Sequence, residues 1–125
     1  MRIPLSLLSL AVLAGGALPA SAHHGWGGNN QAIEKTGKVV RGVSFAGPHA
    51  NMQIQDAEGQ IWDITLAPAP RTSRAGLTEK TLPVGAEVSV RGSRNDNTTV
   101  FEIKTRRVTW QGKNYDVYGS GAGRE

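Results

Sequence analysis

Two histidines beside a signal-type cleavage site are the residues of this 125-residue chain best suited to chemistry. An apolar stretch ends in the small residues Ala-Ser-Ala at positions 20–22, a pattern that signal peptidases cut, and His23 and His24 follow directly. Cleavage between Ala22 and His23 would give His23 a free α-amine. An amine and an imidazole both lose their protons near neutral pH, so both can bind a metal ion. The junction therefore predicts a nitrogen chelate made by export itself.

A third histidine could complete this site. His49 follows a proline in the segment that joins the first two predicted strands. The terminal amine, the His23 imidazole and one more imidazole, from His24 or His49, would give a T-shaped set of three nitrogens. Tetragonal nitrogen ligation suits Cu(II) best, although imidazole also suits zinc and nickel. The ligand set is similar to the histidine brace of copper proteins. The alternative is that His23 and His24 form a polar terminus without a metal and that His49 hydrogen-bonds a turn.

Length and composition restrict the class of protein. Residues 1–22 have the positive start and short apolar centre of a signal peptide, which places the mature protein in the periplasm or outside the cell. The remaining chain, about 100 residues, suffices for one small domain. It contains no cysteine, so neither disulfides nor thiolate ligands are available. No later segment is apolar enough to cross a membrane.

The alternation of apolar and polar residues predicts an all-β fold. A helical candidate of about two turns, residues 71–77, separates three predicted strands from two or three more. The predicted strands cover residues 34–45, 50–55, 60–66, 86–91 and 99–105, with a last hairpin at 110–118. This order matches a small oligonucleotide/oligosaccharide-binding (OB)-like β-barrel of five to six strands with one short helical connection, and an immunoglobulin-like sandwich would need about seven strands. We expect an N-terminal arm at 23–33, the barrel at 34–118 and a tail at 119–125.

Several single residues have predicted places in this barrel. Gly42 interrupts the first strand and predicts a bend or bulge. Trp62 and Met52 lie on the apolar side of their strands and are expected in the core, although a thioether such as that of Met52 could also bind Cu(I). The remaining aromatic residues could either pack on the barrel or stack on a ligand; they are Trp26, Trp110, Tyr115 and Tyr118.

Signatures of catalysis are absent from the sequence, and we expect a binding protein. The serines lack a nucleophile-elbow context, and the carboxylates fall in turns or on polar strand faces with no evident pair in a pocket. The formal net charge of +4 is spread along the chain. A metal-free module that binds an anionic partner is the alternative function, through arginines on the barrel; they are Arg71, Arg74, Arg91 and Arg94. We expect no nucleic acid as partner, because the protein is exported. The oligomeric state is left open.

Four short motifs, in this order, resemble a family of small exported bacterial proteins of unknown function. They are His23-His24-Gly25-Trp26, Pro48-His49-Ala50, Gly59-Gln60-Ile61-Trp62 and Gly76-Leu77. The resemblance spans nearly all of the chain after residue 22, and it departs from the family at Gly47, where asparagine is frequent. It implies export and a small β-barrel and assigns no chemistry. A looser similarity is to exported bacterial OB-fold proteins proposed to bind small ligands.

Overall fold

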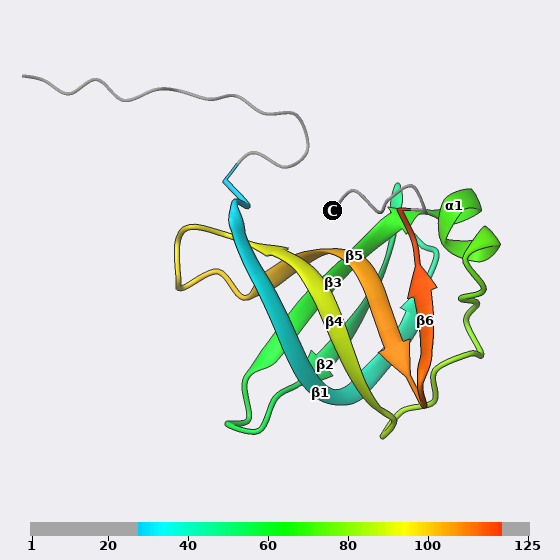
Figure 1. The fold of residues 1–125 in the computed structure, drawn as a ribbon, viewed down its shortest axis with the longest axis horizontal. Helices are drawn as coiled ribbons and strands as arrows, with labels where there is room; N and C mark the ends of the chain where they lie inside the picture. The colour runs from blue at the N-terminus through cyan, green and yellow to red at the C-terminus, as the bar shows by residue number, and fades with distance from the viewer. Residues whose placement is uncertain (1–27, 119–125) are drawn as a thin grey trace, which may run out of the picture.

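The computed structural model describes residues 28–118. The predicted signal peptide, residues 23–27 of the predicted arm and the predicted tail lie outside the described residues. The strands are β1 (Gln31–Ser44), β2 (His49–Gln55), β3 (Ile61–Pro68), β4 (Glu87–Arg94), β5 (Glu102–Trp110) and β6 (Lys113–Asp116), and α1 (Ala69–Arg74) follows β3 (Figure 1).

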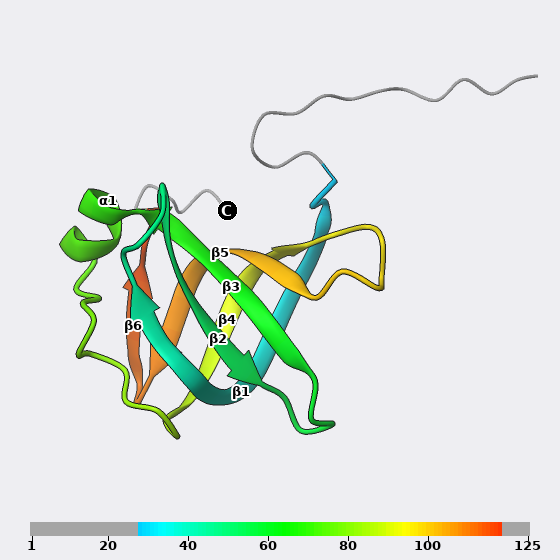
Figure 2. The same cartoon turned by 180° about the vertical axis from the view of Figure 1, so that it is seen from behind.

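The strands form a closed barrel, as the sequence predicts. The sheet order is β3-β2-β1-β4-β5-β6, and a parallel pairing between β3 and β5 closes the first five strands into a ring. β6 pairs with β5 alone and extends the sheet beyond the barrel. The chain forms three antiparallel strands, then a short helix, then two further strands, and the parallel pair closes the ring. This is the OB-like arrangement. Figure 2 shows β2 and β3 crossing the face of the barrel opposite to β4 and β5.

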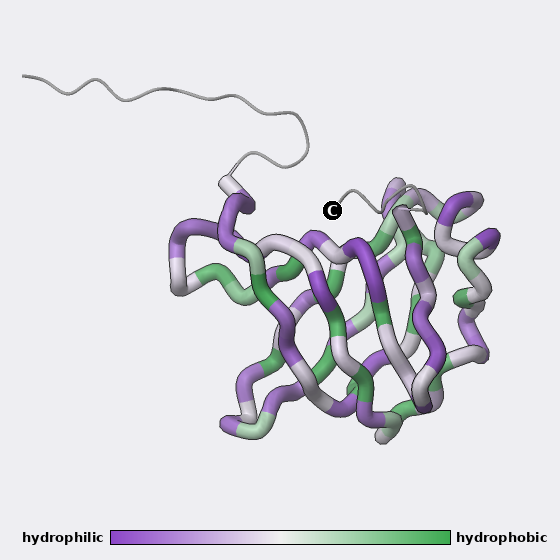
Figure 3. Tube along the Cα trace, in the orientation of Figure 1, coloured by the Kyte–Doolittle hydropathy of each residue, from purple (hydrophilic) through white to green (hydrophobic). Residues whose placement is uncertain are grey.

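Alternating side chains fill the interior of the barrel. Figure 3 shows apolar and polar positions alternating along the strands, because successive side chains point to opposite faces. Six large side chains with less than 2% exposure form the centre of the core: Met52, Ile54, Ile64, Leu66, Leu77 and Ile103. Trp62 is 3% exposed, so the core positions predicted for Met52 and Trp62 are confirmed.

β1 is longer and more irregular than its sequence pattern suggests. It begins at Gln31, so the strand includes the last three residues of the predicted arm. Its pairing with β2 shifts register on both sides of Arg41, which confirms the irregularity predicted at Gly42. These bulges break the simple alternation: Val39 and Val43 are buried, whereas Arg41 points outward and is exposed. The bend lets one strand pair with β4 along its first half and with β2 along its second.

The helix and β5 differ from the predicted boundaries. α1 ends at Arg74 instead of continuing to residue 77, because Gly76 takes a positive φ of 105°. The amides of Gly76 and Leu77 then donate to Ser73 and Thr72, which is a Schellman motif that ends the helix. β5 begins at Glu102, three residues later than predicted. The preceding loop is held by Asn97, whose side chain accepts hydrogen bonds from Thr99.

Candidate functional site

The outer face of the barrel carries an open pocket of about 520 Å³ beside His49. We call it the outer pocket. It is lined by Arg41, Gly47, Pro48, His49, Asn51, Asp63, Thr65, Val100, Phe101 and Glu102. One wall comes from the connection between β1 and β2, the floor from the outward positions of β2 and β3, and the other wall from the end of the β4–β5 loop and the start of β5. OB folds bind ligands at this face.

His49 is the one predicted metal ligand within the described residues. It opens β2 instead of lying in the preceding loop, and it pairs with Pro68 of β3. Its side chain is exposed at the pocket rim and makes no hydrogen bond or ion pair with any residue from 28 to 118. Met52, on the opposite side of the same strand, is fully buried and thus not a ligand at this rim. His23 and His24 lie outside the described residues.

Two carboxylates from neighbouring strands line the outer pocket, contrary to the sequence prediction of no such pair. Asp63 of β3 pairs with Glu102 of β5 across the parallel ladder that closes the barrel. Gln53 donates to Asp63 Oδ1 at 2.7 Å, while Thr65 donates to Glu102 Oε2 at 2.6 Å. Lys104 lies 3.4 Å from the same oxygen of Glu102. The prediction was wrong because periodicity identifies strands but does not show which distant strands become neighbours.

These side chains do not make a metal site by themselves. Among residues 28–118, no group of three His, Asp or Glu side chains lies close enough to hold a metal ion. A metal at the rim would therefore need ligands from outside this range in addition to His49.

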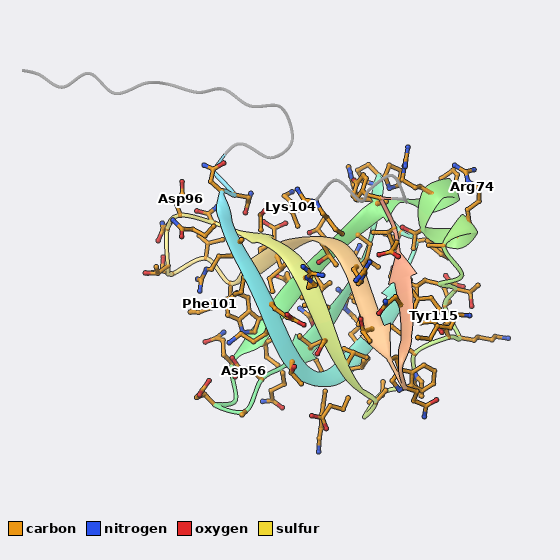
Figure 4. All side chains as sticks on the ribbon, viewed as in Figure 1. Asp56, Arg74, Asp96, Phe101, Lys104 and Tyr115 are labelled. Carbon is orange, nitrogen blue, oxygen red and sulfur yellow. The ribbon has the colours of Figure 1, made fainter. Side chains whose placement is uncertain are left out.

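The chain enters the barrel beside the loop that builds one wall of the pocket. The backbone amide of Asp96 donates to the Gly28 carbonyl at 2.8 Å, and its carboxylate accepts hydrogen bonds from the side chains of Asn30 and Gln31. Asp96 and Phe101 both belong to the β4–β5 loop (Figure 4). The last residues of this loop, Val100 and Phe101, line the outer pocket. Residue 28 is thus fixed to the pocket-forming loop.

The four arginines of the alternative function do not form one patch. α1 carries Arg71 and Arg74 and packs against β2 and β3, whereas Arg91 lies on β4. Figure 4 shows Arg74 on the side of the molecule opposite to Asp96. Arg94 is engaged within the fold, because its guanidinium lies 4.7 Å from the Trp62 ring centroid and donates to the Thr98 and Val100 carbonyls. A shared anion site from these residues is not supported.

A second polar cluster stabilises the end of the barrel. The Trp62 indole N–H donates to Asp56 Oδ2 at 2.9 Å, and Lys35 lies 3.5 Å from the same oxygen and 5.0 Å from the Trp62 ring centroid. The pKa of Asp56 lies below its usual value, chiefly because of the indole hydrogen bond. The amides of Gln60 and Glu58 and the charge of Lys35 lower this pKa further, against burial, which raises it. All groups in the cluster are satisfied within the fold, which indicates a structural role.

The undetermined aromatic residues also belong to the fold where the structure describes them. Tyr115 is buried, and Trp110 and Tyr118 pack against the core as half-buried side chains. None of these three lines the outer pocket, so ligand stacking is not their role there. Trp26 lies outside the described residues. No helix in the described part of the chain is long and apolar enough to cross a membrane.

Comparison with known proteins identifies a family and no activity. Neither the curated proteins nor the solved structures gave a significant match. Residues 11–102 match the family DUF6152, described as a family of unknown function, and this range covers well over half of the chain. That the His-His-Gly-Trp motif marks this family stays a prediction. The chain belongs to the DUF6152 family.

Proposed function

We propose that the protein is a periplasmic copper-binding protein whose first ligand is created by signal-peptide cleavage. The α-amine and imidazole of His23 would chelate one Cu(II) ion, and His49 or His24 would supply the third nitrogen. The role is binding, buffering or delivery of the metal, because no residue of the outer pocket has the context of a nucleophile or an oxidase site.

The observation that carries the proposal is the state of His49. A histidine with a structural role hydrogen-bonds a neighbour, whereas the imidazole of His49 makes no such bond within residues 28–118 and stands exposed at the rim of the outer pocket. A neutral imidazole in this state keeps a nitrogen lone pair for a metal ion.

The position of Gly28 limits where the terminal chelate can form. An extended chain advances at most about 3.6 Å per residue, so His23 can lie no more than about 18 Å from Gly28. Gly28 is tied to the β4–β5 loop, and the end of that loop faces His49 across the outer pocket. The short connection limits the freedom of the terminal amine and raises its effective concentration near His49.

The proposal is tested by comparing two proteins that both begin at His23. One carries a free α-amine, and in its control this amine is acetylated, so the His23 nitrogen is held in an amide and no other amine replaces it. Cu(II) affinity, measured by competition with a chelator of known affinity, should be at least ~100-fold higher for the protein with the free amine, because the control has lost a ligand worth ~3 kcal/mol. Equal affinities would contradict the proposal.

The processing step can be checked in the same organism. The exported protein, isolated without added metal, should have the mass of a chain that begins at His23, and elemental analysis should find about one copper per chain. A different first residue would remove the chelate, whatever the metal content.

A further inference from the structure

Four polar side chains stand in register on neighbouring strands, and three of them, Arg41, Asp63 and Glu102, line the outer pocket. Arg41 of β1 pairs with Gln53 of β2, Gln53 with Asp63 of β3, and Asp63 with Glu102 of β5. Neighbouring strands lie about 4.8 Å apart, so the Cα atoms of Arg41 and Asp63 are about 10 Å apart along this row. A positive charge therefore marks one end of the row. Two carboxylates mark the other end, where Glu102 is paired with Lys104 at 3.4 Å and Asp63 has no cationic partner among residues 28–118.

The two carboxylates are fixed, and each keeps one oxygen available. Hydrogen bonds within residues 28–118 reach Asp63 through Oδ1 and Glu102 through Oε2. Asp63 Oδ2 and Glu102 Oε1 accept none from these residues. The fixed oxygens orient the free ones, which lowers the entropy lost when a donor binds. An ammonium group has three N–H donors, so it suits a site that offers more than one carboxylate oxygen.

Arg41 provides the positive charge at the other end of this row of polar side chains. Its side chain is exposed on the wall of the outer pocket and forms no ion pair with the acidic residues between 28 and 118. Guanidinium binds a carboxylate through two parallel hydrogen bonds, so this end of the row suits a carboxylate.

From this arrangement we infer that the outer pocket binds a short peptide with free ends, its amine at Asp63 and Glu102 and its carboxylate at Arg41. An extended tripeptide is about 10 Å long, which matches the separation of the Arg41 and Asp63 Cα atoms along the row. A single amino acid is too short for both ends. The half-buried side chains of Val100 and Phe101 supply apolar surface for the middle residue. An anion without an amine would meet repulsion from Asp63, whose charge no cation among residues 28–118 offsets.

The inference does not depend on copper, and its test uses metal-free protein. The protein that begins at His23, labelled with ¹⁵N and kept in a chelator, is titrated with triglycine at pH 7 while its amide resonances are recorded. Two further probes each lack one charge: N-acetyltriglycine has no amine, and triglycinamide has no carboxylate. Triglycine should bind at least about tenfold more tightly than either, since each charge-assisted contact contributes roughly that factor. The perturbed resonances should lie around the outer pocket.

Substitutions separate this site from a general effect of charge. Asp63→Asn keeps an oxygen that accepts the Gln53 hydrogen bond and removes only the charge, so it should weaken triglycine and triglycinamide about tenfold and leave N-acetyltriglycine unchanged. Arg41→Gln should weaken triglycine without changing triglycinamide. Glu87→Gln removes an exposed carboxylate of β4 away from the pocket and should change none of these affinities.

Three results would overturn the inference: no saturable binding of triglycine, equal affinity for all three probes, or equal losses in Asp63→Asn and Glu87→Gln. None of these results concerns the copper proposal, whose test is the comparison of the two N-termini.

Discussion

Replacement of Gly92 by alanine should open the barrel between β4 and β5. A Cβ atom at this position would lie 2.0 Å from the carbonyl oxygen of Lys104 and 2.8 Å from the Lys104 carbonyl carbon and the Thr105 Cα, far inside the 3.4 Å at which ordinary contact begins. These are backbone atoms of the paired strand, so no side chain can move aside. The pairing already shifts register at Gly92 to allow this approach.

The cost follows from the backbone that must move. Separating the strands locally removes two or three ladder hydrogen bonds, each worth about 1 kcal/mol, and strains their neighbours, so we expect a loss of about 2–4 kcal/mol in the free energy of unfolding. Urea denaturation followed by circular dichroism should show the midpoint falling by about 1 M or more at an unchanged slope.

Gly42→Ala is the matched control for Gly92→Ala. Gly42 also lies in an irregular strand, but a Cβ there meets only the Leu82 carbonyl oxygen, at 3.4 Å. We expect a loss below about 1 kcal/mol for it. If both variants unfold within about 0.5 kcal/mol of the unsubstituted protein, the close approach of β4 and β5 is refuted.

Three further predictions concern the cluster, the core and the anchor of the arm. Folding lowers the pKa of Asp56, so its carboxylate stabilises the protein above the unfolded-state pKa of about 3.9, and this contribution is lost as pH falls through the folded-state pKa. Asp56→Asn should therefore lower the melting temperature at pH 7. Between pH 4 and pH 2, the melting temperature of this variant should fall less steeply than that of the unsubstituted protein. Met52→Ala should cost about 2–5 kcal/mol in chemical denaturation yet leave Cu(II) affinity unchanged, because this thioether is fully buried. Asp96→Ala should speed amide hydrogen exchange at residues 28–31 without lowering the melting temperature by more than a few degrees.

The parts of the fold that depend on local pattern could be predicted from sequence. The alternation through β2 and β3, with a turn between them, fixed the inward positions of Met52 and Trp62. The bend at Gly42 followed from a glycine inside a strand pattern. The end of α1 was misplaced because the pattern does not reveal that Gly76 takes a positive φ.

The candidate site depended on contacts that no local pattern contains. Asp63 and Glu102 become neighbours through the parallel pairing of β3 with β5, and residues far apart in sequence give no periodic signal of such a contact. Arg41 shares the parity of the buried Val39 and Val43, and strict alternation does not reveal the bulges that turn its side chain outward. A signal was nevertheless present: a charged residue at an apparently buried position indicates a break in the alternation.

The most direct test of the copper proposal asks whether His49 is a ligand. Protein that begins at His23 is loaded with one equivalent of Cu(II), and pulsed electron paramagnetic resonance counts the imidazoles coordinated to the metal through their remote nitrogens. The account predicts that His49→Ala removes one coordinated imidazole and lowers Cu(II) affinity about tenfold or more, with the melting temperature of the metal-free protein unchanged. If His49→Ala has the same spectrum and the same Cu(II) affinity as the unsubstituted protein, His49 of the outer pocket is not a copper ligand.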